Sequence, residues 1–396
     1  MLPLEGLKVV DLTRILSGPF CTMTLADLGA EVIKIESPKG DDTREWGPPF
    51  VGDESAYFLS VNRNKKSIVL NLKTEKGKEI LFRLVKDADV VVENFRPGTL
   101  DRLGIGYETL KKRNRKIILA SISGFGQTGP YAQKPGYDVL AQGMGGLMSV
   151  TGEPGRPPVK GGFSLADLGA GMWAVIGILA ALREREYSGE GQWVDASLLD
   201  TMISWQTYLA GNYFASGENP KPLGGAHPNI VPYQVFEASD GYFILAVGND
   251  SLWESFVDSM NMDILRESRF KSNPDRVKHR NELISILDDI FIGRPKSAWI
   301  QQFEAAKIPC GPVNQFSDIL DDRHVKEREM VIEADHPHAG TFKMLGFPLK
   351  LSRMSGTATT APPLLGQHSG DLLKSLGYDE EEIAAFAADG IINHSH

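Results

Sequence analysis

Short apolar runs alternate with longer amphipathic segments over the first third of the chain, and this alternation limits the possible fold most. The strand-like runs cover residues 7–12, 31–36, 67–72, 88–94 and 116–123, and helical patterns cover 19–30 and 75–86. Repeated units of strand, helix and strand predict a parallel β-sheet with covering helices. The fold class expected from this pattern is therefore α/β.

The length of the chain predicts more than one domain, because 396 residues exceed what one small core usually organises. The segment 216–229 is dense in turn-forming residues and is the best candidate linker. Beyond it, 233–249 has the pattern of a β-hairpin with its turn at Asp240-Gly241, and helical patterns follow over 250–306.

Charge and composition exclude several classes of protein. The net charge of −9 argues against non-specific binding to nucleic acid, although a local basic patch can still hold a small polyanion. Cys21 and Cys310 are the only cysteines, so neither a disulfide framework nor a CxxC metal site is expected. The N-terminus lacks a signal-peptide pattern, and the longest apolar run, Met172–Leu182, has about half of the ~20 residues that span a bilayer. We expect a cytoplasmic protein without a membrane segment.

Two motifs resemble known sites but have simpler interpretations. The stretch 124–129, GFGQTG, matches the dinucleotide fingerprint, but Pro130 and Pro135 follow where that fingerprint needs a helix. We therefore expect a glycine-rich turn at the active site and no nicotinamide. His336 and His338 lack a third ligand and are expected to be surface histidines in a turn, with no metal bound.

Asp167 is the most informative acidic residue, because it stands at the start of an apolar helical stretch, 161–182. One interpretation is structural, since aspartate is a favoured helix N-cap. The other is chemical: small neighbours let a large ligand approach, and a partly desolvated carboxylate can act as a covalent nucleophile. The basic cluster 62–66, NRNKK, has two interpretations as well, a solvated face or a receiver of phosphates or a carboxylate.

The chain resembles the family III CoA-transferases, a group that includes formyl-CoA transferase and carnitine CoA-transferase, over essentially its whole length. The resemblance rests on the order and spacing of VVDLTRILSGPF (9–20), LGAEVIKIE (28–36), NKKSIVLNL (64–72), VENFRPGTLDRLG (92–104), SGFGQTGPY (123–131), the aspartate stretch and PPLLGQH (362–368). The stretches SVNRNKKSI, HPNIVPYQ and PPLLGQH are similar to the branch that moves CoA between dicarboxylic acids such as succinate and glutarate.

This resemblance implies an interlocked homodimer of ring-like subunits. It implies a Rossmann-like large domain with a parallel sheet, built from residues 1–215 and from a returning segment, 326–396. A smaller α+β domain would cover 225–325. The family uses no metal, no nicotinamide and no tightly bound cofactor, and coenzyme A or an acyl-CoA enters as substrate.

The resemblance also implies site residues. Asp167 falls on the catalytic aspartate, which attacks the thioester of the donor. The positions that match CoA contacts are Ile15, Leu70, Asn94, Phe95, Arg102 and Tyr137. Arg102 is the natural phosphate partner, because a guanidinium forms paired hydrogen bonds with phosphate oxygens. The segment 224–227, GGAH, matches a mobile glycine loop over the aspartate, and Leu16 replaces a polar Gln, so the oxyanion must be stabilised by other groups.

Acceptor choice and reaction class leave alternatives. We expect Arg63 to bind the distal carboxylate of a dicarboxylic acceptor, whereas the competing interpretations are a CoA phosphate contact or a solvent-facing side chain. An α-methylacyl-CoA racemase shares the resemblance, but Tyr137 stands where a racemase has its histidine, so the acid–base pair is incomplete. A catalytically silent CoA-binding protein is the third possibility.

Overall fold

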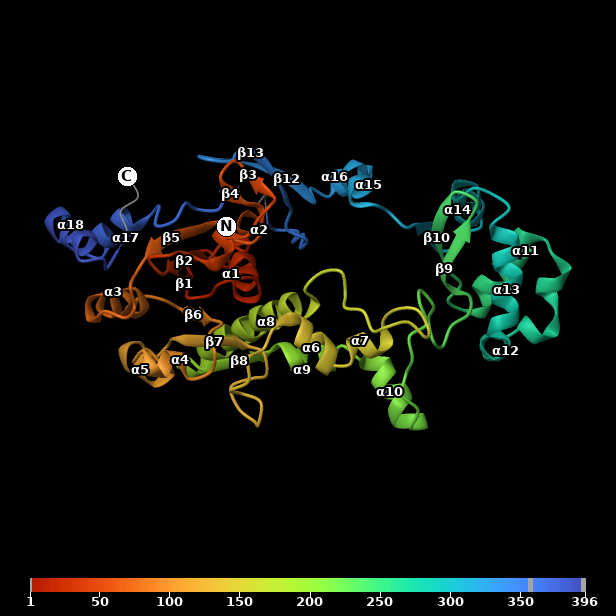
Figure 1. The fold of residues 1–396 in the computed structure, drawn as a ribbon, viewed down its shortest axis with the longest axis horizontal. Helices are drawn as coiled ribbons and strands as arrows, with labels where there is room; N and C mark the ends of the chain where they lie inside the picture. The colour runs from red at the N-terminus through yellow and green to blue at the C-terminus, as the bar shows by residue number, and fades with distance from the viewer. Residues whose placement is uncertain (1, 355–358, 393–396) are drawn as a thin grey trace. The chain divides into compact units, whose positions relative to one another are not determined.

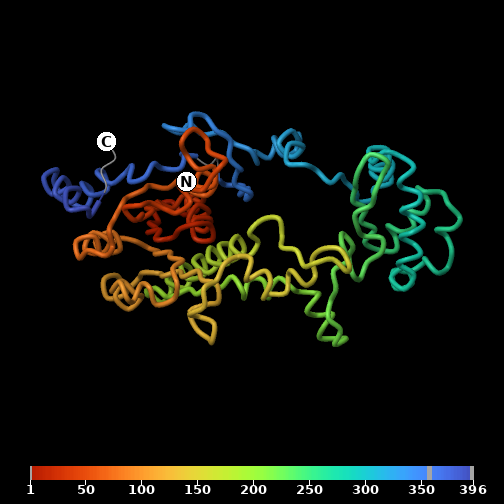
Figure 2. The backbone as a smooth tube through the Cα atoms, in the orientation of Figure 1, coloured from red at the N-terminus to blue at the C-terminus, as the bar shows by residue number. Residues whose placement is uncertain are grey.

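A computed structural model describes residues 2–354 and 359–392, and the chain forms two compact units (Figures 1 and 2). The larger unit consists of residues up to 147, 160–214 and the part from 324 onward, and the second unit consists of 148–159 and 215–323. The predicted domain limits at 215, 225 and 325 stay predictions, and part of the last segment, 355–358 and 393–396, lies outside the described residues. The sequence pattern did not anticipate that 148–159 belongs with the second unit.

The larger unit is built on a six-stranded sheet in which every neighbouring pair of strands is parallel, as predicted. The strand order is β5-β2-β1-β6-β7-β8. The strands are β1 (Lys8–Asp11), β2 (Glu31–Glu36), β5 (Lys65–Val69), β6 (Val90–Glu93), β7 (Ile118–Ser123) and β8 (Trp193–Ser197). The order reverses between β1 and β6, and ligands of open α/β sheets bind beyond the carboxyl ends of strands at such a point.

Helices cover both faces of this sheet (Figure 1). On one face a core cluster joins α1 and α8 to the strands through residues such as Cys21, Leu25 and Ile178. On the other face Ile80 and Leu373 belong to a second cluster with the opposite sides of the strands. The helices of this unit are α1 (Ser17–Asp27), α2 (Ala56–Ser60), α3 (Glu75–Lys86), α4 (Thr99–Arg102), α5 (Tyr107–Arg113), α6 (Asp138–Met144), α8 (Leu165–Ser188), α9 (Leu198–Ser204), α17 (Ser369–Ser375) and α18 (Glu380–Ala388), with the 3₁₀ helix η1 (Asp42–Glu45).

The strand predicted at 67–72 begins earlier, at Lys65, because this lysine is buried inside the fold. Its ammonium lies 3.1 Å from a carboxylate oxygen of Asp11 and donates to the carbonyl of Pro19 at 3.0 Å and to the side chain of Asn62 at 2.8 Å. Burial lowers the pKa of Lys65 to about 8. The sequence alone does not distinguish a lysine with buried partners from a solvated one. The solvated-face interpretation of 62–66 is therefore wrong for Asn62, Arg63 and Lys65, which are buried, whereas Lys66 is exposed.

Helix α8 is longer than the apolar run that predicted it. By length and composition alone its 24 residues could cross a membrane. In this structure it packs against α1, β7 and β8, and its small residues allow close approach. A Cβ added at Gly171 would lie 2.6 Å from the carbonyl oxygen of Ser17, so the backbones of α8 and α1 nearly touch there.

Two short antiparallel pairs complete the larger unit, β3 (Phe50–Val51) with β4 (Glu54–Ser55) and β12 (Val331–His336) with β13 (Gly340–Leu345). The expectation of two surface histidines is wrong for His336, which is 3% exposed. Its Nδ1 accepts hydrogen bonds from the backbone N–H groups of His338 and Ala339 and so closes the turn of the β12–β13 hairpin. Within residues 2–354 and 359–392, no group of three or more His, Cys, Asp or Glu side chains is arranged to hold a metal.

The second unit contains the predicted hairpin and helices. Strands β9 (Tyr233–Ala238) and β10 (Gly241–Ala246) pair antiparallel around the Asp240-Gly241 turn, and β11 (Cys310–Pro312) adds to β10. Phe243 and Phe291 lie in its core and contact each other edge-to-face. The helices are α11 (Asp250–Met260), η2 (Asp263–Arg266), η3 (Ser268–Phe270), α12 (Asn273–Lys278), α13 (Arg280–Phe291), α14 (Lys296–Ala305) and α15 (Phe316–Asp321), while α7 (Leu147–Val150), α10 (Thr207–Ser216) and α16 (Arg323–Glu327) span the unit boundaries.

Candidate active site

Asp167 lies in the first turn of α8, and its carboxylate is not the helix cap. The N-cap residue is Ser164, whose side chain makes no capping hydrogen bond. The free N–H groups of this turn are bound by Asp138 of α6 instead: its Oδ1 accepts from Ala166 at 2.8 Å and from Asp167 at 3.3 Å. The structural interpretation of Asp167 as an N-cap is therefore wrong, and its side chain is available for chemistry.

The environment of Asp167 makes its carboxylate unusually basic. Burial, with a further contribution from the nearby negative charge of Asp138, raises the pKa of Asp167 to about 7. The same neighbourhood affects Tyr57 of α2, because burial and the charge of Asp167 raise the pKa of that phenol to about 12. A more basic carboxylate is a stronger nucleophile once it is ionised, so this environment suits covalent chemistry near neutral pH.

A cavity of about 140 Å³ opens beside Asp167 and collects several residues expected to contact CoA. Ile15, Asn94, Phe95 and Tyr137 all line it together with Asp167. These residues come from the segments after β1 and β6, the two strands that flank the reversal of strand order, and from the start of α6. The fold therefore gathers five of the predicted residues at the crevice where α/β sheets bind ligands.

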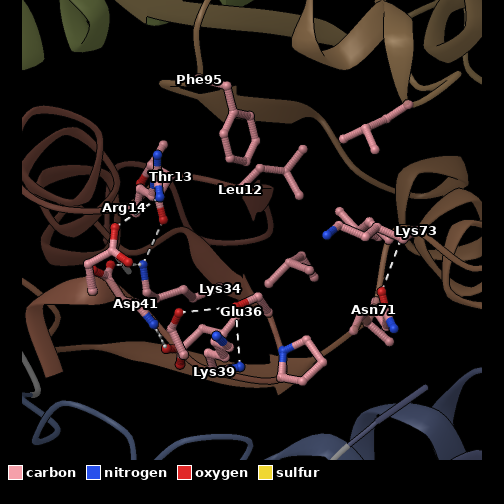
Figure 3. Close-up of a pocket in the computed structure, with 18 residues that line it drawn as sticks. Leu12, Thr13, Arg14, Lys34, Glu36, Lys39, Asp41, Asn71, Lys73 and Phe95 are labelled. Carbon is pink, nitrogen blue, oxygen red and sulfur yellow. Dashed lines mark hydrogen bonds and ion pairs between the residues drawn. The ribbon is translucent and has the colours of Figure 1, made fainter. Parts of the chain in front are cut away.

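A second cavity, of about 470 Å³, lies beyond the carboxyl ends of β2 and β5 and shares Arg14 and Phe95 with the first (Figure 3). Leu70, another expected CoA contact, lines it. Lys39 and Lys73 also line it, and both are exposed. The ammonium groups of these two lysines suit phosphate oxygens.

The sequence analysis did not predict Lys39 and Lys73 as cavity residues, although their positions after two strands could have indicated it. Lys39 follows β2 and Lys73 follows β5, and these strands are parallel neighbours in the sheet. Because the carboxyl ends of parallel neighbours meet at one edge of the sheet, lysines in those two positions can line the same cavity.

The loop between β1 and α1 is held in a strained conformation at the first cavity. Ile15 has φ of +72°, which is rare for a β-branched residue and is found where surrounding structure enforces it. Asn94 accepts from the N–H of Arg14 at 2.9 Å and donates to its carbonyl at 2.7 Å, and Asp41 accepts from the N–H of Ile15 at 3.2 Å. Both polar groups of the Asn94 amide are thus used to position this loop, in which Leu16 stands.

The Asp41 carboxylate in this arrangement is strongly held. It binds the buried ammonium of Lys34 at 2.8 Å and accepts from the backbone and hydroxyl of Thr43. Burial raises the pKa of Asp41, but the ion pair with Lys34 and the hydrogen bonds from Thr43 outweigh it and hold the pKa at about 2. The Asp41 carboxylate that supports this loop is therefore ionised at neutral pH.

The glycine motif 124–129 forms a turn after β7, and no helix opens there, as expected. Gly124 lies against Gly136: a Cβ on Gly124 would lie 2.6 Å from the Cα of Gly136. Both glycines line the cavity beside Asp167. Their lack of side chains lets two backbone segments meet and form one wall of that cavity.

Two predicted residues lie outside both cavities. Arg102 is exposed on α4, where its guanidinium donates to the hydroxyl of Thr99 at 2.8 Å. Arg63 is only 4% exposed, and its guanidinium binds both carboxylate oxygens of Asp27 at 2.9 and 2.5 Å and the carbonyl of Leu345 at 2.9 Å. The solvent-facing interpretation of Arg63 is therefore wrong. Its guanidinium already binds Asp27 and Leu345 inside the protein, so this geometry does not support the expected contact with the distal carboxylate of an acceptor.

The segment 224–227 belongs to the second unit. The N–H of Gly224 donates to the carbonyl of Gly152 at 2.9 Å, and the carbonyl of His227 accepts from Arg280 of α13 at 2.8 Å. Its expected role as a mobile loop over the aspartate stays a prediction.

Comparisons with known proteins agree with the geometry. The model of CoA-transferase family III matches residues 4–369. The chain is 42% identical to the succinyl-CoA:glutarate CoA-transferase of Mus musculus over 395 residues, which cover 99% of this chain and 91% of that protein. It is 40% identical to the succinate–glutarate CoA-transferase of Agrobacterium fabrum over 382 residues, 94% of this chain and 96% of that protein.

A crystal structure of a CAIB/BAIF family protein from Brucella suis superposes with a TM-score of 0.84 at 43% sequence identity, covering 95% of this chain and 99% of that chain. These relatives do not favour the racemase alternative, because those of known activity are named as CoA-transferases. The chain belongs to CoA-transferase family III and is an enzyme of that family.

Proposed function

We propose that this enzyme moves CoA from succinyl-CoA to a second dicarboxylic acid, with glutarate as the first candidate, through covalent intermediates on Asp167. The observation that carries the proposal is the carboxylate of Asp167, which is half-buried and has no hydrogen bond or ion pair to its oxygens within the described residues. It stands at the cavity beyond the carboxyl ends of β1, β6 and β7. The names of the relatives from Mus musculus and Agrobacterium fabrum support the choice of acids.

The proposed reaction consists of two symmetrical halves. An oxygen of Asp167 attacks the thioester carbon, the carbon–sulfur bond breaks, and CoA thiolate leaves behind a mixed anhydride. The thiolate then attacks the aspartyl carbon, which releases the donor acid and leaves an aspartyl-CoA thioester. The acceptor carboxylate attacks that carbon and expels CoA thiolate, which finally attacks the acceptor's acyl carbon and frees Asp167. Each step exchanges one acyl bond for another and needs no water.

The two cavities suggest how CoA would lie in the enzyme. Lys39 and Lys73 offer ammonium groups for phosphates at one end, and Asp167 stands at the other. Phe95 lines both cavities and offers an apolar wall to the part of CoA that passes between them. Arg102 is exposed on α4, a few residues after Phe95 in the sequence, and in this proposal it is a further partner for the phosphates.

A homodimer is part of the proposal. Met172, Trp173, Ile176 and Leu179 form an apolar stripe on α8 and are 37–52% exposed. Apolar stripes of this kind on soluble proteins mark interaction surfaces. We assign this stripe to a second copy of the chain, which is also what the family resemblance implies.

The decisive experiment traps the covalent intermediate. Enzyme mixed with succinyl-CoA and treated with hydroxylamine or borohydride is expected to carry a modification on Asp167, read by peptide mass spectrometry. Asp167→Ala should fold but show no transfer and no modification. Asp200→Ala, at an exposed residue of helix α9, is the matched control and should behave like the unmodified enzyme.

A panel of acceptors then tests the substrate. Succinyl-CoA is supplied with glutarate, other dicarboxylates and monocarboxylates, and the acyl-CoA products are identified by mass spectrometry. We expect glutaryl-CoA to form with the highest kcat/KM. Transfer by Asp167→Ala would overturn the mechanism, whereas preferred transfer to monocarboxylates would overturn only the choice of acceptor. CoA binding without any transfer would favour the catalytically silent alternative.

A further inference from the structure

Two side chains on α6, Asp138 and Gln142, hold the segment that delivers Asp167. They are one helical turn apart, and Gln142 donates to Oδ2 of Asp138 at 2.6 Å. The other oxygen of Asp138 accepts from the N–H groups of Ala166 and Asp167. The amide oxygen of Gln142 accepts from the N–H of Gly161 at 2.8 Å. The segment from 161 to 167 is therefore fixed at both ends by the same pair.

The burial of this pair indicates a role other than ligand binding. Gln142 is fully buried, and both ends of its amide are used inside the protein. Asp138 lines the cavity beside Asp167, but both of its oxygens already accept hydrogen bonds from α8 or Gln142. These hydrogen bonds hold the Asp138 carboxylate in one position beside Asp167.

The charge of Asp138 acts on Asp167 more directly than any other in its surroundings. Other titratable or charged side chains also lie on the elements and loops around the start of α8. They are Cys21 and Asp27 on α1, Tyr57 on α2, Asp195 on β8, Asp200 on α9, Lys160 just before the braced segment, and Arg14, Arg96, Lys134 and Tyr137 at the cavity. Apart from burial, only Asp138 shifts the pKa of Asp167. Like charges held close together oppose each other's ionisation and raise basicity.

We propose that Asp138 and Gln142 are positioning residues for the nucleophile, and that Asp138 also sets the reactivity of Asp167 through its charge. The inference rests on the proposed role of Asp167. Gln142 orients Asp138, Asp138 fixes the first turn of α8, and the repulsion between the two carboxylates makes Asp167 a better nucleophile than an isolated aspartate. Asp138 itself does not touch the reacting atoms.

The charge is tested by Asp138→Asn, which keeps an oxygen for the two N–H groups of α8. The measurement is the rate of CoA thiol release in a single turnover with succinyl-CoA, from pH 5 to 9. Because Asp167 reacts only when ionised, the unmodified enzyme should lose activity as the pH falls through about 7. Asp138→Asn should move this acid limb to lower pH by about 0.5–1 pH unit and lower the plateau rate by about 3- to 30-fold. An unchanged acid limb would overturn the assigned role of the charge.

Glu93 can also contribute to the acid limb of this pH profile, because burial raises its pKa to about 7 and its carboxylate accepts from the N–H of Phe95, a residue of the cavity. It is identical in both proteins, so only the difference between the two profiles is assigned to Asp138. Asp200→Asn is the matched control and should leave the profile in place.

The orienting role is tested by Gln142→Leu, which removes the hydrogen bonds at a similar side-chain volume. We expect kcat to fall about 10- to 100-fold with less than a 3-fold change in KM for succinyl-CoA, since Gln142 touches no ligand. The double variant D138N/Q142E restores a hydrogen bond between the two positions and moves the negative charge one turn away from Asp167. It should fold as well as the unmodified enzyme and keep the lowered acid limb, even where Q142L folds poorly.

The outcomes separate this inference from the proposed function. If the unmodified enzyme forms no Asp167 adduct, the proposed function fails first. If the adduct forms but D138N keeps the original acid limb, or Q142L changes KM and leaves kcat intact, the inference alone fails.

Discussion

At the scale of single residues, Asp167 shows how a reactive group is maintained at the expense of stability. Its pKa of about 7 in the folded protein lies above the ordinary value of 3.8. The folded state therefore binds more protons than the unfolded state between these values. The contribution of Asp167 to the free energy of unfolding is thus largest below about pH 4 and decreases as the pH rises toward 7.

This linkage predicts that Asp167→Asn stabilises the protein while it abolishes transfer. At pH 8 the gain in unfolding free energy should be about 1–3 kcal/mol, and at pH 5 less than half of that, because the asparagine does not ionise. Urea unfolding at both pH values and at one protein concentration measures the difference. An equal gain at both pH values would contradict the linkage.

Arg63, unlike Asp167, is a buried charged residue whose ion pair is expected to stabilise the fold. Arg63→Ala leaves the buried carboxylate of Asp27 without its ion-pair partner, although the amide of Asn64 still donates to it, and such a loss typically costs about 3–5 kcal/mol of stability. We expect the double variant Arg63→Ala, Asp27→Ala to recover part of this loss, measured by urea unfolding. The ratio of kcat/KM for glutarate to that for a monocarboxylate should stay within about 3-fold. A selective loss of glutarate transfer would restore the clamp hypothesis.

At the scale of elements, the close approach of α8 and α1 positions the active site. Asp167 stands one turn before Gly171 on α8, and Ser17, whose carbonyl faces Gly171, lines the same cavity as Asp167. The distance between the two helices therefore sets the width of the cavity at the nucleophile. A side chain at the contact would change both packing and chemistry.

Gly171→Ala should accordingly lower the free energy of unfolding by about 1–3 kcal/mol, because the added Cβ would meet backbone that cannot move aside easily. The release of CoA thiol in a single turnover should slow as well. Gly211→Ala, in helix α10, is a suitable control, since a Cβ there meets nothing within 4 Å. If both variants are equally stable and active, the contact between the helices does not shape the site.

At the scale of the whole molecule, the exposed apolar stripe on α8 is expected to pack against a second copy of the chain. We expect the protein to run as a dimer in native mass measurements, and tagged and untagged subunits to exchange negligibly over days, because interlocked chains must unfold to separate. Ile176→Glu, a charge in the middle of the stripe, should prevent assembly. Ile292→Glu, at a similarly exposed isoleucine of the second unit, should be tolerated. Rapid exchange under native conditions would contradict an interlocked dimer.

The sequence by itself determined the elements whose signals are local. Strand β2 (Glu31–Glu36) and helix α3 (Glu75–Lys86) begin and end where the patterns predict, because clean apolar periodicity and a capping residue, Thr74, act within a few positions. The turn at 124–129 was predicted from Pro130 and Pro135, which follow it where a dinucleotide site would need a helix. The family followed from the order of short motifs, which comparison with relatives confirmed.

The tertiary structure decided which polar residues are buried and what they bind. Arg63 was expected at a ligand, and the cluster that contains Lys65 was left open between a solvated face and a receiver of phosphates or a carboxylate. In the structure each of the two side chains binds an acidic partner that is distant in sequence. The brace of Asp138 on α8 links residues 28 positions apart. A charged side chain looks the same in sequence whether water or a buried ion partner surrounds it, and only the packing of distant segments determines which of the two stabilises it.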